Sequence, residues 1–338
     1  MNISGNISNQ EKKYYSVISV YASAASIPVL FIGFIVNVFV LYVIVNDNFF
    51  YKTPYYLIRI SLVSNIIATL IGTTSFSIAA MAHIDYTLGS YMCRIFFYII
   101  QSSYTLSIFT LCIISIDRYF VIIKPFLRFY SKHRRNLLIS MVTFALILSI
   151  IFNIPTIFYV DVYPDETVVC DMIHINSFTI ASLIVNIIII YFIPTGILLF
   201  MYGTIFKHQY NYVRPGNISI HTRINLHMKK KKFNQVLIAT AASYLLITWP
   251  YFATGIAIAI TKKSLRQMGD ENMVYYVLAF VSYSTTVGIS VINPFLYLKF
   301  DYNIKKKSRY YLQKCITRKT ATEYRRRSIL VSATMYNY

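Results

Sequence analysis

The chain has 338 residues, of which 57% are hydrophobic, 17% aromatic and only 13% charged. The charged share is about half that of an ordinary soluble domain, which excludes a typical soluble globular protein. The formal net charge of +20 is distributed between apolar segments and forms no basic face of a soluble domain, so it does not indicate nucleic-acid binding.

Seven stretches contain no Asp, Glu, Lys or Arg: 17–45, 60–82, 95–116, 136–160, 175–206, 233–261 and 272–298. Each is longer than the roughly 18 residues that distinguish a membrane-spanning helix from a buried core helix. We therefore expect an all-α membrane protein, a seven-transmembrane helix bundle over residues 17–300 with tails at 1–16 and 301–338. Seven crossings place the two ends of the chain on opposite sides of the membrane.

The distribution of basic residues predicts the orientation, since lysine and arginine accumulate in cytoplasmic loops. With the N-terminus outside, most of the 32 lysines and arginines fall on the cytoplasmic side. The first span alone gives the opposite signal, because Lys12 and Lys13 precede it and only Lys52 follows. The later loops outweigh it, so we expect a multi-pass plasma-membrane protein with an extracellular N-terminus. The outer loop after the fourth span then carries four acids: Asp161, Asp165, Glu166 and Asp171.

The expected extracellular tail carries two glycosylation sequons, at Asn2 and Asn6. A third such triplet, at Asn217, falls in a loop assigned to the cytoplasm, which shows how readily these triplets arise by chance. We expect glycosylation at the N-terminal pair alone.

Polar residues stand inside the first spans. Because burial of a polar group in lipid is costly, we expect these residues to have a function. In the first span, Gly33 and Asn37 are one helical turn apart on the same face, as suits contact between helices. The second span carries Asn65.

The third span joins Cys93 to the triplet Asp117-Arg118-Tyr119. As a helix this segment is roughly 37 Å long, a little more than the hydrocarbon core of a bilayer. One helix therefore carries a cysteine at one membrane surface and the triplet at the other. An arginine at the membrane edge needs an acceptor, which Asp117 supplies.

Later spans add three proline motifs in order. Pro194 is followed eight residues later by Tyr202, the sixth span holds Trp249-Pro250, and the seventh ends in Asn293-Pro294-Phe295-Leu296-Tyr297. A proline removes one helical hydrogen bond and kinks the helix, so Pro250 gives the inner half of the sixth span a lever. With the triplet and Pro125, these motifs resemble those of rhodopsin-like (class A) G-protein-coupled receptors, over residues 20–312.

The resemblance implies a cytoplasmic site that couples to a G protein. Arg118 would lie at the floor of the cavity that receives a G-protein helix, with Tyr202 and Tyr297 turning inward on activation. The family often has an acid on the sixth helix that holds this arginine; here Lys230 occupies that place, so we expect only Asp117 to restrain Arg118 and agonist-free signalling to be appreciable. The implied coupling and switch residues are Asp117, Arg118, Tyr119, Pro125, Phe126, Tyr202, Asn293, Pro294 and Tyr297.

Two further sites follow from the resemblance. Asn65 stands where the family usually has an aspartate that helps to bind sodium, so we expect a water-filled polar network without tight sodium binding, formed by Asn37, Asn65, Ser107 and Asn293. In the sixth helix, Trp249 and Pro250 would form the kink. Thr248, however, occupies the place of the family's tryptophan.

The cysteines and the basic tail predict modification and lipid contact. Cys93 and Cys170 both face the oxidising side and can form a disulfide; the alternative is two free thiols. Gly89, four residues before Cys93, matches a glycine of the family. Cys315 follows the seventh span and is a palmitoylation candidate. Between the seventh span and Cys315, the basic residues 305–307 predict a short amphipathic helix on anionic membrane lipids.

The resemblance places seven residues around a ligand pocket: Ile100, Gln101, Tyr104, Asn186, Tyr251, Phe252 and Tyr283. Ile100 stands where amine receptors have an aspartate, which argues against a monoamine, and a seventh span without lysine excludes a retinal Schiff base. The acidic outer loop is compatible with a basic peptide, and a small organic chemosensory molecule is equally open.

We therefore expect a G-protein-coupled receptor that binds an extracellular peptide or small chemosensory molecule and activates a heterotrimeric G protein. The alternative, a seven-helix transporter or channel, predicts charged residues along a midplane pathway and an internal repeat, and the sequence has neither. Phosphate-binding loops, zinc-protease motifs and paired mid-membrane carboxylates are also missing from the sequence, so we expect neither an enzyme nor a cofactor.

Overall fold

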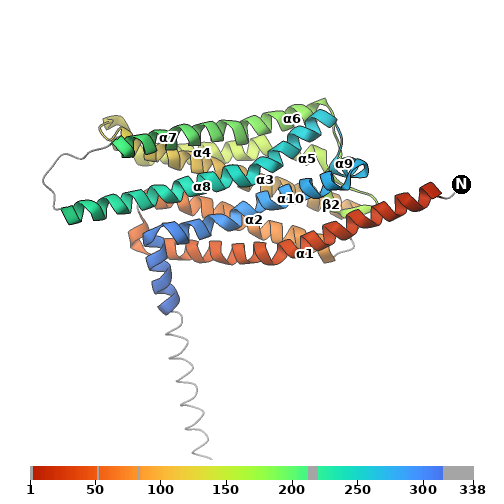
Figure 1. The fold of residues 1–338 in the computed structure, drawn as a ribbon, viewed down its shortest axis with the longest axis horizontal. Coiled ribbons are helices and arrows are strands. Elements are labelled where there is room, and N and C mark those ends of the chain that lie inside the picture. Colours follow the sequence, from red (N-terminus) through yellow and green to blue (C-terminus); the bar gives the residue numbers. More distant parts are fainter. Residues whose placement is uncertain (1–2, 52, 82–83, 212–219, 315–338) are drawn as a thin grey trace, which may run out of the picture.

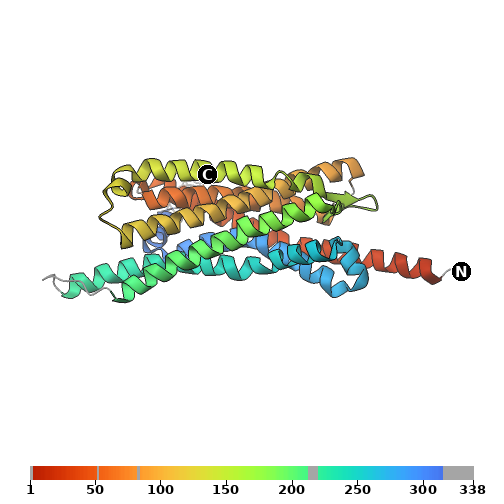
Figure 2. The ribbon, with the colours of Figure 1, turned by 90° about the horizontal axis from the view of Figure 1, so that it is seen from above.

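The computed structural model describes residues 3–51, 53–81, 84–211 and 220–314, with side chains for 20–51, 55–80, 84–208 and 238–314. Seven of its helical segments are long and apolar enough to cross a membrane, which confirms the predicted seven-helix bundle. Their long axes run side by side in both views of the ribbon (Figures 1 and 2). The spanning elements are α1 (Ile3–Asn46), α2 (Thr53–Met81), α3 (Tyr86–Ile123), α4 (Arg128–Asn153), α6 (Ser177–Ile187) continued by η2 (Ile188–Phe192) and α7 (Ile193–Asn211), α8 (Ile220–Thr261) and α10 (Met273–Phe300).

Helix α3 occupies the centre of the bundle, in contact with α2, α4 and α7. Its C-terminal half is almost fully buried from Ile108 to Ser115, although it contains serine and threonine. These hydroxyls are tolerated because they donate back to carbonyls of their own helix, as Thr110 does to Leu106. The central helix therefore links the two ends of the bundle directly.

The first helix is longer than expected. Helix α1 begins at Ile3, so residues 3–16, expected as a tail, continue the first span beyond the bundle (Figure 1). A helix already nucleated by a long apolar segment adds further residues at low cost, and no proline precedes Pro28. Of the two sequons, Asn2 and the side chain of Asn6 lie outside the described residues.

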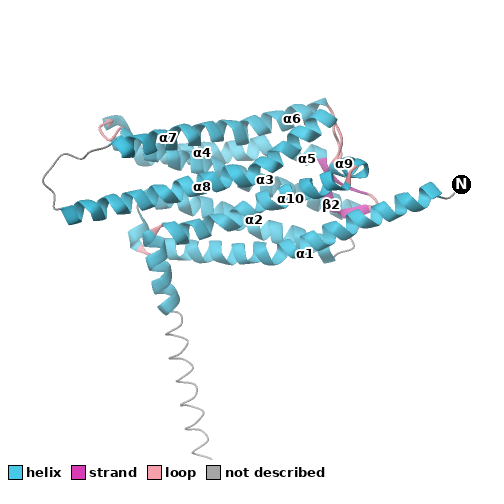
Figure 3. Ribbon diagram, viewed as in Figure 1, coloured by secondary structure: helices cyan, strands magenta, loops and turns pink. Residues whose placement is uncertain are grey.

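A β-hairpin, which the sequence analysis did not predict, forms the loop after the fourth span (Figure 3). The short helix α5 (Thr156–Tyr159) leads into β1 (Val160–Tyr163), which pairs antiparallel with β2 (Glu166–Met172). The predicted disulfide between Cys93 and Cys170 is confirmed and ties β2 to α3, with the two Cα atoms 5.6 Å apart. Gly89 allows this approach, because a Cβ atom there would collide with the carbonyl oxygen of Thr167.

After the seventh span, residues 302–314 form the expected short helix, which turns away from the bundle (Figure 1). Asp301 caps it by accepting hydrogen bonds from the backbone N–H groups of Asn303 (2.9 Å) and Ile304 (3.0 Å). Ile304 is fully buried against α1 and α2, whereas Lys306 and Arg309 are exposed, so the helix is amphipathic. Cys315 lies outside the described residues. The short helix α9 (Leu265–Glu271) belongs to the loop before α10.

Candidate functional site

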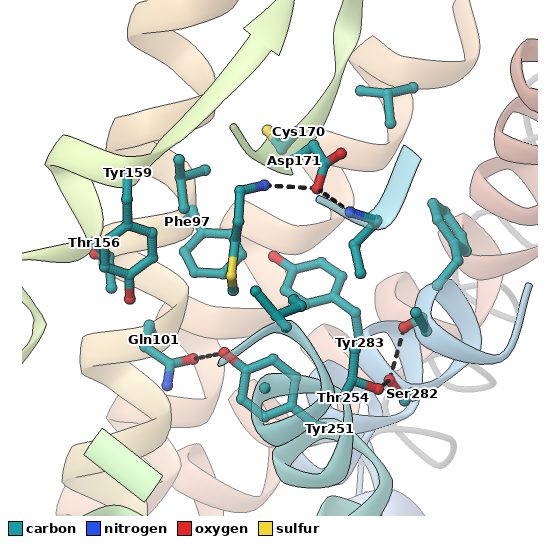
Figure 4. Close-up of a pocket in the computed structure, with 18 of the residues that line it drawn as sticks. Phe97, Gln101, Thr156, Tyr159, Cys170, Asp171, Tyr251, Thr254, Ser282 and Tyr283 are labelled. Atoms are coloured by element: carbon teal, nitrogen blue, oxygen red, sulfur yellow. Dashed lines mark hydrogen bonds between the residues drawn. The ribbon is translucent and has the colours of Figure 1, made fainter. Parts of the chain in front are cut away.

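A cavity of about 100 Å³ opens at the end of the bundle that carries the hairpin (Figure 4). Most of its walls come from α2, α3, β2, α6, α8 and α10, with further residues from the short elements beside the hairpin and from α1. Five of the seven residues expected around a ligand pocket line it: Gln101, Asn186, Tyr251, Phe252 and Tyr283. These five are part of a larger lining, most of which the sequence analysis did not name.

The other two expected pocket residues lie elsewhere. Ile100 packs between the first, second and seventh spans, against Leu30 and Val291. Tyr104 lies one turn further along α3, in aromatic contact with Tyr244 and Phe252, at ring-centroid distances of 5.9 and 6.4 Å. The reason is helical geometry: neighbours in sequence point about 100° apart, so Ile100 cannot share the cavity-facing side of Gln101.

Sequence reasoning missed Phe97, which also lines the cavity. Its ring stacks on Tyr283 with a centroid distance of 5.4 Å and an interplanar angle of 6° (Figure 4). Phe97 precedes Gln101 by four residues and hence shares its helix face, a spacing that could have revealed it. Thr156 and Tyr159, next to the hairpin, complete this side of the cavity.

The cavity lining is apolar and aromatic with a few polar groups. The hydroxyl of Tyr251 donates a long hydrogen bond of 3.4 Å to Gln101 Oε1, and Thr254 pairs with Ser282 at 3.1 Å (Figure 4). Asn186 is only 8% exposed, and its Oδ1 has no hydrogen-bond partner among the described residues. A buried acceptor without a partner is costly, so this wall can receive a hydrogen-bond donor.

Asp171 is the one residue with a charged side chain among the described residues that line the cavity. Its carboxylate accepts hydrogen bonds from the backbone N–H groups of Met172 (2.6 Å), Leu265 (3.1 Å) and Arg266 (3.0 Å). Because these donors saturate it, Asp171 holds the loops together. The carboxylate keeps its negative charge, but most of its hydrogen-bonding capacity is used within the protein and is not available to a bound molecule.

Two more acids of the loop, Asp161 and Asp165, are also partnered, whereas Glu166 Oε1 has no hydrogen-bond partner among the described residues. Asp161 pairs with Arg94, and Asp165 pairs with Arg266 at 2.7 Å. Burial raises the pKa of Asp161, but hydrogen bonds from Ser90 and Arg94 outweigh burial, and the pKa lies below its ordinary value. These internal ion pairs leave less acidic charge for a basic peptide than the sequence indicated.

At the opposite end of α3, Asp117 is fully buried and binds three groups. Arg118 Nη2 lies 3.1 Å from Asp117 Oδ2. Arg134 of α4 donates two hydrogen bonds to the same carboxylate, from Nε at 2.7 Å and from Nη2 at 2.8 Å, and the Tyr130 hydroxyl donates at 2.8 Å. The sequence analysis anticipated Asp117 with Arg118 but missed both partners from α4. The side chain of Lys230 lies outside the described residues.

The remaining coupling candidates surround this cluster or lie beyond it. Tyr202 and Tyr297 are buried, at 8% and 2% exposure. Pro125 and Phe126 form the turn after α3, and Phe126 is 93% exposed. A fully exposed phenylalanine in a turn is available for contact with a partner. Tyr119 points toward α7, with its ring centroid 6.5 Å from that of Phe200.

The expected polar network is only partly connected by direct contacts. Ser107 donates to Asn65 Oδ1 at 3.0 Å, while Asn37 donates to the carbonyl of Ser290 at 2.9 Å and joins α1 to α10. Asn293 Oδ1 has no hydrogen-bond partner in the described part of the chain. Ser107 and Asn293 line a small cavity of about 10 Å³, roughly the size of one water molecule.

The sixth span differs most from expectation. Trp249 is 54% exposed on the outside of the bundle, whereas Thr248 is fully buried. Pro250 lies inside helix α8, which forms the sixth span. Large buried residues flank this proline on both sides: Phe252, at 3% exposure, and Tyr244, at 1%, which the sequence analysis did not single out. A tryptophan next to a proline therefore faces the surroundings, and a tyrosine fills the core.

The sequence of this chain is similar to those of several known proteins. The model of the family described as "7 transmembrane receptor (rhodopsin family)" matches residues 36–297. Neuropeptide Y receptor type 2 of Sus scrofa is 21% identical over 290 residues, which cover 82% of this chain and 72% of the relative. Galanin receptor 2a of Danio rerio is 25% identical, over 66% of this chain and 58% of the relative. N-formyl peptide receptor 3 of Macaca mulatta is also 25% identical, over 65% and 63%.

Proposed function

Because the chain belongs to the rhodopsin family of seven-transmembrane receptors, we propose that it binds an extracellular peptide at the cavity and activates a heterotrimeric G protein at the opposite end. Receptor function and a multi-pass membrane location follow from the family. Family members are receptors, not enzymes, and a transporter is not favoured.

The observation that carries the proposal is the layout of α3. Gln101, in the first half of this helix, lines the cavity, and Asp117, near its C-terminal end, forms the buried ion-pair cluster. A bound molecule that moves the outer half of α3 or its neighbours can therefore alter the environment of Arg118 through one continuous helix. This arrangement supports a signal that crosses the membrane without transport.

The chemistry of the cavity supports a ligand whose buried part is uncharged. Aromatic walls, a saturated Asp171 and the unpartnered Oδ1 of Asn186 suit an apolar or aromatic group that carries a hydrogen-bond donor. The names of the relatives support a peptide as the source of that group. A small neutral chemosensory molecule is the second candidate, favoured by the same apolar and aromatic lining.

At the other end, the proposed coupling surface consists of Arg118 and the residues around it. Phe126, exposed in the turn after α3, would contact the G protein, while Tyr202 and Tyr297 would support Arg118 once it is released. The proposed orientation, with the N-terminus outside and the plasma membrane as location, is supported by the basic residues of the later loops. Glycosylation of Asn2 and Asn6 and palmitoylation of Cys315 belong to the same proposal.

A ligand screen on cells that express the receptor, read out with sensors for several G-protein types, tests the proposal. Hits should lose potency at least tenfold when Asn186 is replaced by leucine, since the ligand then loses a hydrogen bond in a buried site. The exposed Ile184→Leu variant, two residues away, is the matched control. Hits that act equally on both variants would place the ligand elsewhere.

A further inference from the structure

Asp117 has more donors than the resting ion pair with Arg118 requires. Its two carboxylate oxygens accept from Arg134 at 2.7 and 2.8 Å and from Tyr130 at 2.8 Å. Arg118 approaches the same carboxylate with one nitrogen, at 3.1 Å. Two guanidinium groups from two helices therefore share one buried negative charge.

The two arginines do not hold the carboxylate equally. Arg134 makes the paired N–H contacts, a geometry that is both stronger and more restrictive than a single contact. Arg118 makes the longer, single contact. Since the negative charge is already compensated by Arg134, the attraction that Asp117 exerts on Arg118 is reduced.

We propose that Arg134 is a positioning residue that competes with Arg118 for Asp117 and so favours the release of Arg118. This inference rests on the proposed function, in which Arg118 must leave Asp117 to receive the G protein. It also revises the expectation that Asp117 alone determines how firmly Arg118 is held. Tyr130 acts in the same direction with a smaller share, since its hydroxyl also donates to the carboxylate, at the oxygen that Arg118 does not contact.

Alternatively, the ion pair between Arg134 and Asp117 only holds α3 and α4 together, a role that we call a tie. The two roles give opposite signs in a comparison of two variants. Arg134→Gln and Asp117→Asn break the same ion pair between the helices, so a tie predicts that both change basal signalling in the same direction. Competition predicts that Arg134→Gln strengthens the hold on Arg118, whereas Asp117→Asn removes it.

The experiment measures guanine-nucleotide exchange on purified G proteins by the full-length receptor in lipid nanodiscs, without ligand and per mole of receptor. Arg134→Gln should lower basal exchange roughly threefold, the effect of a partly exposed ion pair, and Asp117→Asn should raise it. Arg135→Gln is the matched control, because the neighbouring Arg135 is exposed and forms no ion pair among the described residues. A rise or no change with Arg134→Gln would overturn the proposal.

A second measurement separates this inference from the proposed function and covers loss of folding. Melting temperatures of Asp117→Asn, Arg118→Gln and the double variant give the coupling between the two residues, with and without Arg134→Gln. Competition predicts a larger coupling without Arg134. If the energetic coupling between Asp117 and Arg118 is larger without Arg134 while no variant activates any G protein, the competition is supported and the proposed G-protein activation fails. If this energetic coupling is the same with and without Arg134, the competition is overturned. Arg134→Lys, which keeps the charge but not the paired contacts, should fall in between and preserve the fold.

Discussion

The hydroxyl of Tyr244 in α8 donates a hydrogen bond of 2.7 Å to the carbonyl of Ile190 in η2. In a regular helix that carbonyl would accept from residue 194, but Pro194 has no N–H group. The π-helical turn η2 immediately before this proline marks the same local disruption. Tyr244 therefore satisfies a carbonyl that its own helix leaves open and joins the sixth span to the fifth.

Removal of this hydroxyl should destabilise the bundle. Tyr244→Phe keeps the ring and its packing but leaves the buried Ile190 carbonyl without a donor, which should cost about 1–3 kcal/mol. Thermal unfolding of the purified receptor measures the loss. Tyr275→Phe, at a residue 55% exposed, is the control and should leave stability unchanged. Equal melting temperatures for wild type and Tyr244→Phe would show that the bond contributes nothing.

The receptor should not respond to sodium. Asn65, hydrogen-bonded to Ser107, brings no negative charge to the polar cluster, and a sodium ion there would pay its desolvation without a carboxylate ligand. Replacing sodium chloride by potassium chloride at equal ionic strength should leave the melting temperature unchanged. Asn65→Asp should create a sodium-dependent rise. Stabilisation of the wild type by sodium would contradict this account.

The disulfide should stabilise the end of the bundle that carries the hairpin. Cys93 and Cys170 are 77 residues apart in sequence, and a loop of that size predicts a loss of about 2–5 kcal/mol when the bond is removed. Cys93→Ser, Cys170→Ser and the double variant should all lose the same amount in thermal unfolding, because each removes the same bond once. A double variant less stable than both single variants would show separate contributions from the thiols.

Stability should fall with rising pH through Glu166. Burial raises the pKa of Glu166 above its ordinary value of 4.5, the charge of Arg266 lowers it, and the nearby Asp165 and Asp171 raise it. A raised pKa means that the folded state binds more protons than the unfolded one, so stability decreases as the pH rises from about 4.5 through the folded pKa. Glu166→Gln should flatten this decrease in melting temperature. Asp270→Asn, an exposed acid, should leave the decrease in place.

The sequence alone predicted the seven spans, the disulfide and the two ends of α3, because each depends on hydropathy, chain order or side of the membrane. It missed the pairing of Arg134 with Asp117, since residues 17 apart on two helices meet only through the turn at Pro125. It missed the hairpin, because β1 is only 4 residues long and its alternation is brief. It assigned Ile100 by family position and not by helix face, and Ile100 lies in a core cluster away from the cavity lining. The exposed Trp249 shows the same limit, since the direction of a side chain near a proline depends on tertiary packing.

Guanine-nucleotide exchange driven by the purified receptor tests the central claim most directly. Full-length receptor in nanodiscs should accelerate exchange on at least one type of heterotrimeric G protein without ligand. Asp117→Asn should raise this rate and Arg118→Ala should reduce it to that of empty nanodiscs. If neither wild type nor Asp117→Asn accelerates exchange on any G-protein type, although the receptor is folded and correctly inserted, the account of Arg118 as a coupling residue is contradicted.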